Sequence, residues 1–91
     1  MELDKNCVIK ILAQIEFKLL DRYYTNDPYS LHFESTNNNP YKIINFQISK
    51  EHKDHVIYNP PVKKSLKSYC DVIKVDFIDI HQKLELCNNI K

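Results

Sequence analysis

Hydrophobic residues recur at helical spacing over residues 7–24, CVIKILAQIEFKLLDRYY, which is the longest periodic segment of the chain. Asp4 lies where an N-cap would accept from the first free backbone amides. Pro28 ends the segment, because the residue before a proline avoids the helical region. We therefore expect one long N-terminal helix. On a wheel that advances about 100° per residue, its core stripe consists of Val8, Ile11, Leu12, Ile15, Leu19 and Tyr23.

The apolar surface of this predicted helix is wider than one core stripe. It continues from about 100° to about 180° around the wheel through Ile9, Ala13, Phe17, Leu20 and Tyr24. A helix with one buried side would keep about half of its circumference polar. Two interpretations are open: another helix of the same chain covers this side, or the side contacts another protein or a second copy of the chain.

Residues 29–36 and 41–49 alternate between apolar and polar side chains, a pattern typical of half-buried strands. The residues between them, Asn-Asn-Asn-Pro at 37–40, tolerate turn conformations, so the two strands are predicted to form a hairpin. A third strand is expected over residues 55–59, antiparallel to the second. It ends at two consecutive prolines, which cannot donate to a β-ladder.

A short second helix is predicted over residues 62–69, since Pro61 suits the first helical position. Residues 71–78 alternate again and predict a strand that extends to Ile80, followed by a terminal helix or an extended tail. The alternative is a helix from Phe77, with an Asp79–Lys83 pair four residues apart.

The predicted fold class is therefore α+β, with residues 1–91 forming one domain. Its long N-terminal helix packs on a three- or four-stranded, mainly antiparallel sheet, accompanied by the short second helix.

Composition supports an ordinary globular domain, with 43% hydrophobic and 27% charged residues. A net charge of +1 gives no general attraction to nucleic acids or anionic membranes. The chain contains neither an apolar run of membrane-spanning length nor a secretory-signal pattern. We therefore expect a cytoplasmic location without a membrane partner. The three cysteines, Cys7, Cys70 and Cys87, lack a framework spacing and are expected to be reduced, with a Cys70–Cys87 disulfide as the alternative.

Glycine is absent, and Arg22 is the single arginine among 13 basic residues. Scarce Gly and Arg beside abundant Asn, Ile, Lys and Tyr indicate an AT-rich genome, such as that of a phage or another mobile element. The absence of glycine also excludes the dinucleotide fingerprint, the P-loop and the nucleophile elbow, which all require glycine.

No set of residues forms a complete catalytic or metal motif. The histidines of His52-Lys53-Asp54-His55 could join the cysteines around zinc, but zinc sites of this kind have close ligand pairs on both sides. Cys70 and His81 lack a recognisable oxyanion hole. The acidic residues within 71–79 fit the outward positions of the predicted strand. We expect no enzyme activity, metal or cofactor.

We accordingly predict a small non-catalytic protein-binding module, of the kind a phage or mobile element uses as a stoichiometric inhibitor in anti-defence, immunity or antitoxin roles. The surplus apolar residues listed above would bind the partner, which is another protein or a second copy. The alternative is a small nucleic-acid-binding regulator that uses a basic region, with tyrosines nearby for stacking. That region comprises Lys63, Lys64, Lys67 and Lys74.

Overall fold

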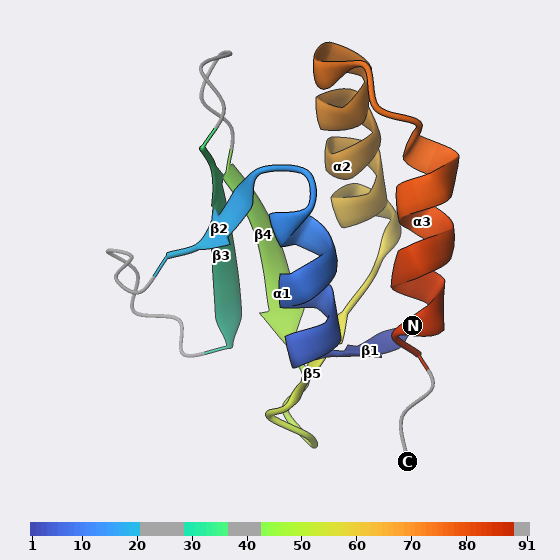
Figure 1. Cartoon of the computed structure of the whole chain (residues 1–91). Helices are drawn as coiled ribbons and strands as arrows, with labels where there is room; N and C mark the ends of the chain where they lie inside the picture. Colours follow the sequence, from blue (N-terminus) through green and yellow to red (C-terminus); the bar gives the residue numbers. More distant parts are fainter. Residues whose placement is uncertain (21–28, 37–42, 89–91) are drawn as a thin grey trace.

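The computed structural model describes residues 1–20, 29–36 and 43–88. These residues form five strands and three helices (Figure 1). In chain order the elements are β1 (Glu2–Asp4), α1 (Lys5–Ala13), β2 (Phe17–Leu19), β3 (Ser30–Ser35), β4 (Ile43–Ile48), β5 (His55–Ile57), α2 (Pro60–Ile73) and α3 (Phe77–Leu86).

The strands form one antiparallel sheet in the order β1-β5-β4-β3-β2. The α+β class and the antiparallel sheet are thus confirmed, whereas the predicted three or four strands are too few. Residues paired across antiparallel strands share a face, so Leu3 and Val56 lie on the same side as their neighbours in β4 and β3. The three helices cover this apolar face (Figure 1). The opposite face carries polar residues, including Glu2, His55, Asn45, Glu34 and Lys18.

A single core lies between the sheet and the helices. Its most specific contact is made by Tyr69 of α2, whose hydroxyl donates to the Ile15 carbonyl at 3.0 Å. The Ser35 hydroxyl is hydrogen-bonded to the same Tyr69 oxygen at 3.0 Å. The Tyr69 ring also contacts Phe17, with ring centres 4.2 Å apart. Because a buried tyrosine hydroxyl needs partners, this network fixes α2 against the start of β2.

The prediction of one long N-terminal helix is wrong for residues 14–20, and its remaining residues 21–24 lie outside the described residues. Helix α1 ends at Ala13, and Glu16 adopts a left-handed backbone with φ of 66° that turns the chain into β2. Ile15 and Phe17 are then buried while Glu16 and Lys18 are exposed, an alternation of period two. The helical wheel treated the period-two alternation of residues 15–18 as a continuation of the helical period of α1. This explains why the predicted apolar arc was too wide.

The predicted strand over residues 71–80 is also wrong. Helix α2 continues to Ile73, and Lys74 ends it in the left-handed conformation with φ of 59°. Asp76 caps α3 by accepting from the Ile78 amide at 3.0 Å. The alternative helix from Phe77 is the correct interpretation, and its Asp79–Lys83 ion pair is present at 3.3 Å.

The hairpin of β3 and β4 and the antiparallel β5 are confirmed by their register. Asp4 caps α1 as predicted, since its carboxylate accepts from the Cys7 amide at 2.9 Å. The predicted second helix is present, but it extends over Pro60–Ile73 instead of residues 62–69. The Asn59 side chain caps it by accepting from the Val62 amide at 3.1 Å. The predicted turn at 37–40 lies outside the described residues.

A disulfide joins Cys7 in α1 to Cys87 after α3, across 80 residues of sequence. The prediction of reduced cysteines is wrong for this pair, and the alternative Cys70–Cys87 bridge is not formed. Cys70 is a buried free thiol. Beside the disulfide, the Asp4 amide of β1 donates to the Cys87 carbonyl at 2.9 Å. The two ends of the described chain are therefore held together covalently and through the backbone.

Candidate functional site

The residues predicted to bind a partner do not share one helix face. Phe17 is only 2% exposed and belongs to β2. Ile9 packs against the core, Ala13 is exposed at the end of α1, and Leu20 is half-buried after β2. Tyr24 lies outside the described residues. The single face on which this hypothesis rested is therefore not formed, because the helix ends before Phe17.

The lysines of the alternative prediction are all exposed. Three of them lie on α2 and Lys74 follows it. Lys67 forms an ion pair with Asp71 at 3.2 Å. Lys64 borders a hollow of about 350 Å³ between α2 and the start of β4, together with Ser65, Ser68, Ile43 and Ile44. The structure thus brings the α2 lysines onto one solvent-facing surface beside a shallow hollow.

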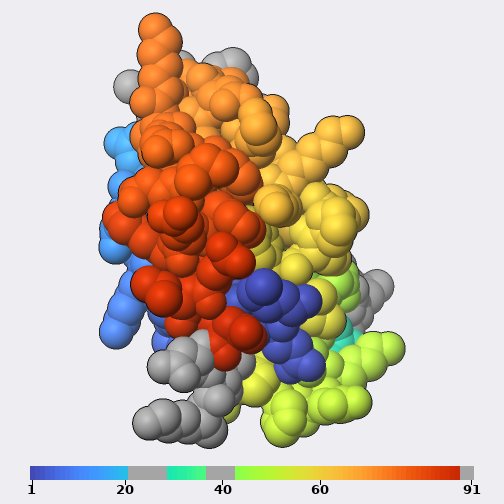
Figure 2. Space-filling view, turned by 90° about the vertical axis from the view of Figure 1, so that its right-hand side faces the viewer, coloured from blue at the N-terminus to red at the C-terminus, as the bar shows by residue number. Residues whose placement is uncertain are grey.

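Helix α3 exposes two large apolar side chains, Ile78 at 56% and Leu86 at 76% of their surface. They follow each other with Gln82 at four-residue intervals, so the three lie along one outer side of the helix. The opposite side is buried in the core through Phe77, Ile80 and Leu84. Figure 2 looks onto α3, with the start of the chain beside its lower end. We call Ile78, Gln82 and Leu86 the α3 stripe.

Charged residues flank the α3 stripe. Asp79 pairs with Lys83 at 3.3 Å, and Glu85 lies 3.3 Å from His81 Nε2. With Asp76 at the N-cap, α3 and its cap carry three carboxylates and one lysine, in contrast to the lysine-rich α2. The apolar stripe is therefore bordered by a predominantly acidic rim.

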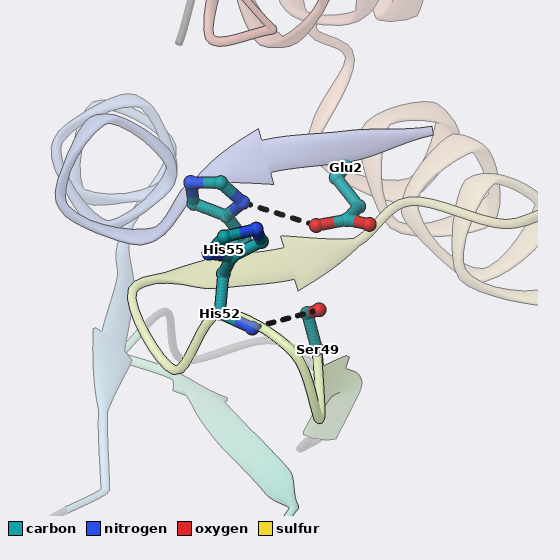
Figure 3. Close-up of polar contacts among 4 residues, drawn as sticks. All are labelled: Glu2, Ser49, His52 and His55. Carbon is teal, nitrogen blue, oxygen red and sulfur yellow. Dashed lines mark hydrogen bonds and ion pairs between the residues drawn. The ribbon is translucent and has the colours of Figure 1, made fainter. Parts of the chain in front are cut away.

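A polar cluster occupies the opposite face of the sheet, where β1 meets β5 (Figure 3). His55 Nδ1 lies 3.0 Å from the Glu2 carboxylate. The His52 ring lies beside the His55 ring, with centres 4.8 Å apart and planes inclined by 37°. The turn is held by the His52 amide, which donates to the Ser49 hydroxyl at 3.3 Å. The His55 amide donates to the His52 carbonyl at 3.0 Å.

The hydrogen bond from His55 is the main reason that the pKa of Glu2 is lowered. A contact with Ser49 and the nearby imidazoles act in the same direction, while partial burial opposes them. Glu2 also borders a hollow of about 350 Å³ with Ser49, Lys50 and Glu51. The carboxylate is thus kept ionised next to two imidazoles at an accessible position.

Two buried groups near α3 are poor candidates for catalysis. Burial, aided by Asp71 and Asp76, raises the pKa of the Cys70 thiol and so keeps it protonated. Burial also raises the pKa of Tyr58 to about 12. His81, considered above as a base for Cys70, instead places Nδ1 3.0 Å from the Tyr58 hydroxyl and Nε2 close to Glu85.

The sequence contained signals for the α3 stripe and for the cluster of His52, His55 and Glu2. The spacing of Ile78, Gln82 and Leu86 forms a stripe only when this segment is assigned to a helix. The His52–His55 spacing was visible, but its contact with Glu2 depends on the pairing of β1 with β5. No periodicity in a single sequence indicates that pairing.

The described residues contain no helix long and apolar enough to cross a membrane. They also contain no cluster of three or more His, Cys, Asp or Glu side chains arranged to hold a metal ion. No protein-family model, curated protein or solved structure matches the chain.

Proposed function

We propose that the chain is a protein-binding module whose α3 stripe contacts the partner. The observation that carries the proposal is the exposure of Ile78 and Leu86 on a helix whose opposite side is packed into the core. Exposed apolar groups on a rigid helix suit helix-mediated recognition, because their burial is favourable and the helix loses little conformational freedom on binding. The inhibitor role predicted above is one form of such stoichiometric binding.

The acidic rim favours a different protein over a second copy. Asp79 and Glu85 lie on opposite flanks of the stripe, and each has a partner within α3, Lys83 and His81. Carboxylates still outnumber lysine on α3 and its cap, so two copies joined along α3 would bring like net charges together. A partner that presents apolar side chains surrounded by lysine or arginine would complement the same surface. The proposed occupant is therefore a protein with a basic-rimmed apolar patch.

Replacing both apolar residues of the stripe, as Ile78→Ser/Leu86→Ser, is expected to weaken partner binding by at least about thirtyfold. The loss follows from the apolar area that the variant no longer buries. Wild type and variant would be used to capture proteins from an extract of the source organism. The dissociation constant would then be measured with each purified partner.

Val72→Ser supplies the matched control, because Val72 is 43% exposed but belongs to α2 and is not part of the α3 stripe. It should bind like wild type. Equal binding by the double serine variant would refute the role of α3. Dimers of the chain alone in light scattering that disappear in the double variant would instead assign the stripe to self-association, contrary to the proposal.

A nucleic-acid-binding regulator remains the second candidate, supported by the exposed α2 lysines beside the hollow at Ser65 and Ser68. Lys64→Glu is expected to weaken oligonucleotide binding at low salt and to reduce the slope of log K against log salt by about one or more. Lys10→Glu, an equal charge change on α1, should have less effect. Equal retention of both variants and wild type in a gel-shift assay would contradict this candidate.

A further inference from the structure

We propose that His52 and His55 form a binding site for a divalent transition-metal ion, with Glu2 as the positioning residue of His55. Imidazole nitrogens suit zinc, copper and nickel ions. His52 lies in the turn between β4 and β5, and His55 begins β5 next to Glu2 of β1 (Figure 3). This site is separate from the α3 stripe and from the α2 lysines, and it does not depend on the proposed function.

The separation of the two rings fits a shared ion. A zinc–nitrogen bond of about 2.0–2.1 Å places the ion about 3.2 Å from the ring centre. Two rings that coordinate one ion at an angle of about 100° therefore have centres about 4.9 Å apart. The observed distance is 4.8 Å. The planes are inclined by 37°, and the exposed His52 side chain would rotate to direct one of its ring nitrogens at the same ion as His55.

Glu2 prepares His55 for this role. Since the carboxylate accepts the hydrogen bond, His55 carries its proton on Nδ1 and leaves the Nε2 lone pair available. Metal-binding histidines commonly donate their second ring N–H to a carboxylate, which fixes the ring and raises ligand basicity. The contact spans β1 and β5 across 53 residues of sequence, so the folded sheet holds the imidazole before an ion arrives.

The site supplies two protein ligands, and water would complete the coordination of the ion. Among the described residues no third His, Cys, Asp or Glu side chain converges on the pair. Such a site is open at its remaining coordination positions.

The test is a titration of the oxidised full chain with Zn²⁺ alone, followed by calorimetry and by the NMR signals of the histidine rings. We expect one ion per chain and shifts confined to His52 and His55. His52→Ala or His55→Ala should weaken binding at least tenfold, and the double variant should abolish it. Glu2→Gln, which keeps the side-chain shape, should weaken binding about tenfold to a hundredfold through its effect on His55.

His81→Gln is the control for a histidine outside the site and should bind Zn²⁺ like wild type. Circular dichroism of each variant would verify that the fold is retained. The proposal is overturned if wild type binds no Zn²⁺, or if the double alanine variant binds it as tightly as wild type. Shifts centred on His81 or His32 would also overturn it. Unchanged affinity in Glu2→Gln would remove the positioning role of Glu2.

Discussion

Removing the disulfide, as Cys7→Ser/Cys87→Ser, is expected to lower the free energy of unfolding by about 4 kcal/mol. The bridge closes a loop of 80 residues, so it restricts nearly the whole unfolded chain. The chain-entropy model gives about 4.5 kcal/mol for a loop of this length at 25 °C. A single domain of this size has a stability of only about 5–15 kcal/mol, which makes this the largest covalent contribution to the fold.

Urea unfolding of oxidised wild type and the double serine variant would measure the loss. Reductant should shift the midpoint of wild type toward that of the variant and leave the variant itself unchanged. That control separates the disulfide from any effect of Cys70, which is a free thiol in both proteins. A variant with the stability of oxidised wild type would show that the Cys7–Cys87 bond contributes nothing. Disulfides of this kind persist in oxidising compartments, which weakens the prediction of a cytoplasmic location.

Phe17→Ala is expected to lower the free energy of unfolding by about 3–5 kcal/mol, as is usual for a large aromatic residue in a core. Phe17 is 2% exposed and its ring lies against Tyr69. The cavity would also disturb the Tyr69 hydrogen bonds to Ser35 and Ile15. Chemical denaturation measures the effect, and the variant should retain only a small free energy of unfolding at 25 °C.

Lys18→Ala is the matched control, because Lys18 is the exposed neighbour in the same strand. Its stability should change by no more than about 0.5 kcal/mol. The long-helix prediction implies the opposite behaviour, with Phe17 on a partner surface and a small effect on stability. A Phe17→Ala variant as stable as wild type would therefore contradict the position of Phe17 in β2.

Patterns within one element were sufficient to predict much of the sheet. The alternation in β3 and β4 reflects one face packed on helices and one polar face, and both strands were assigned correctly. The cap at Asp4 was predicted because its side chain meets a backbone amide only three residues away.

Junctions without glycine could not be predicted in the same way. Both errors occur where a charged residue, Glu16 or Lys74, takes the left-handed conformation that usually selects glycine or asparagine. Without that signal, the helical period before residue 14 was extended into β2. Similarly, inward side chains at Ile73, Val75 and Phe77 alternated like a strand although they belong to two helix ends and their connection.

The candidate sites were predictable only where they depend on residues close together in the sequence. The lysines of α2 are exposed, as their positions beside the apolar residues of the predicted helix indicated. The α3 stripe required the correct helix, and the Glu2–His55 contact required a pairing between distant strands. Likewise, the Cys7–Cys87 bond follows from the packing of α1 beside the end of α3, which cysteine spacing does not encode.

The two outer strands also affect how the sheet meets other chains. β1 and β2 are three residues long, shorter than the six- or seven-residue segments that sustain cross-β stacking. At β1, the outward Asp4 amide already donates to the Cys87 carbonyl. At β2, Lys18 places a charge on the outer strand, a common protection against edge-to-edge aggregation. These two edges are thus poorly suited to recruiting further strands. The proposed recognition through α3 would therefore carry less risk of uncontrolled polymerisation than strand pairing at a sheet edge.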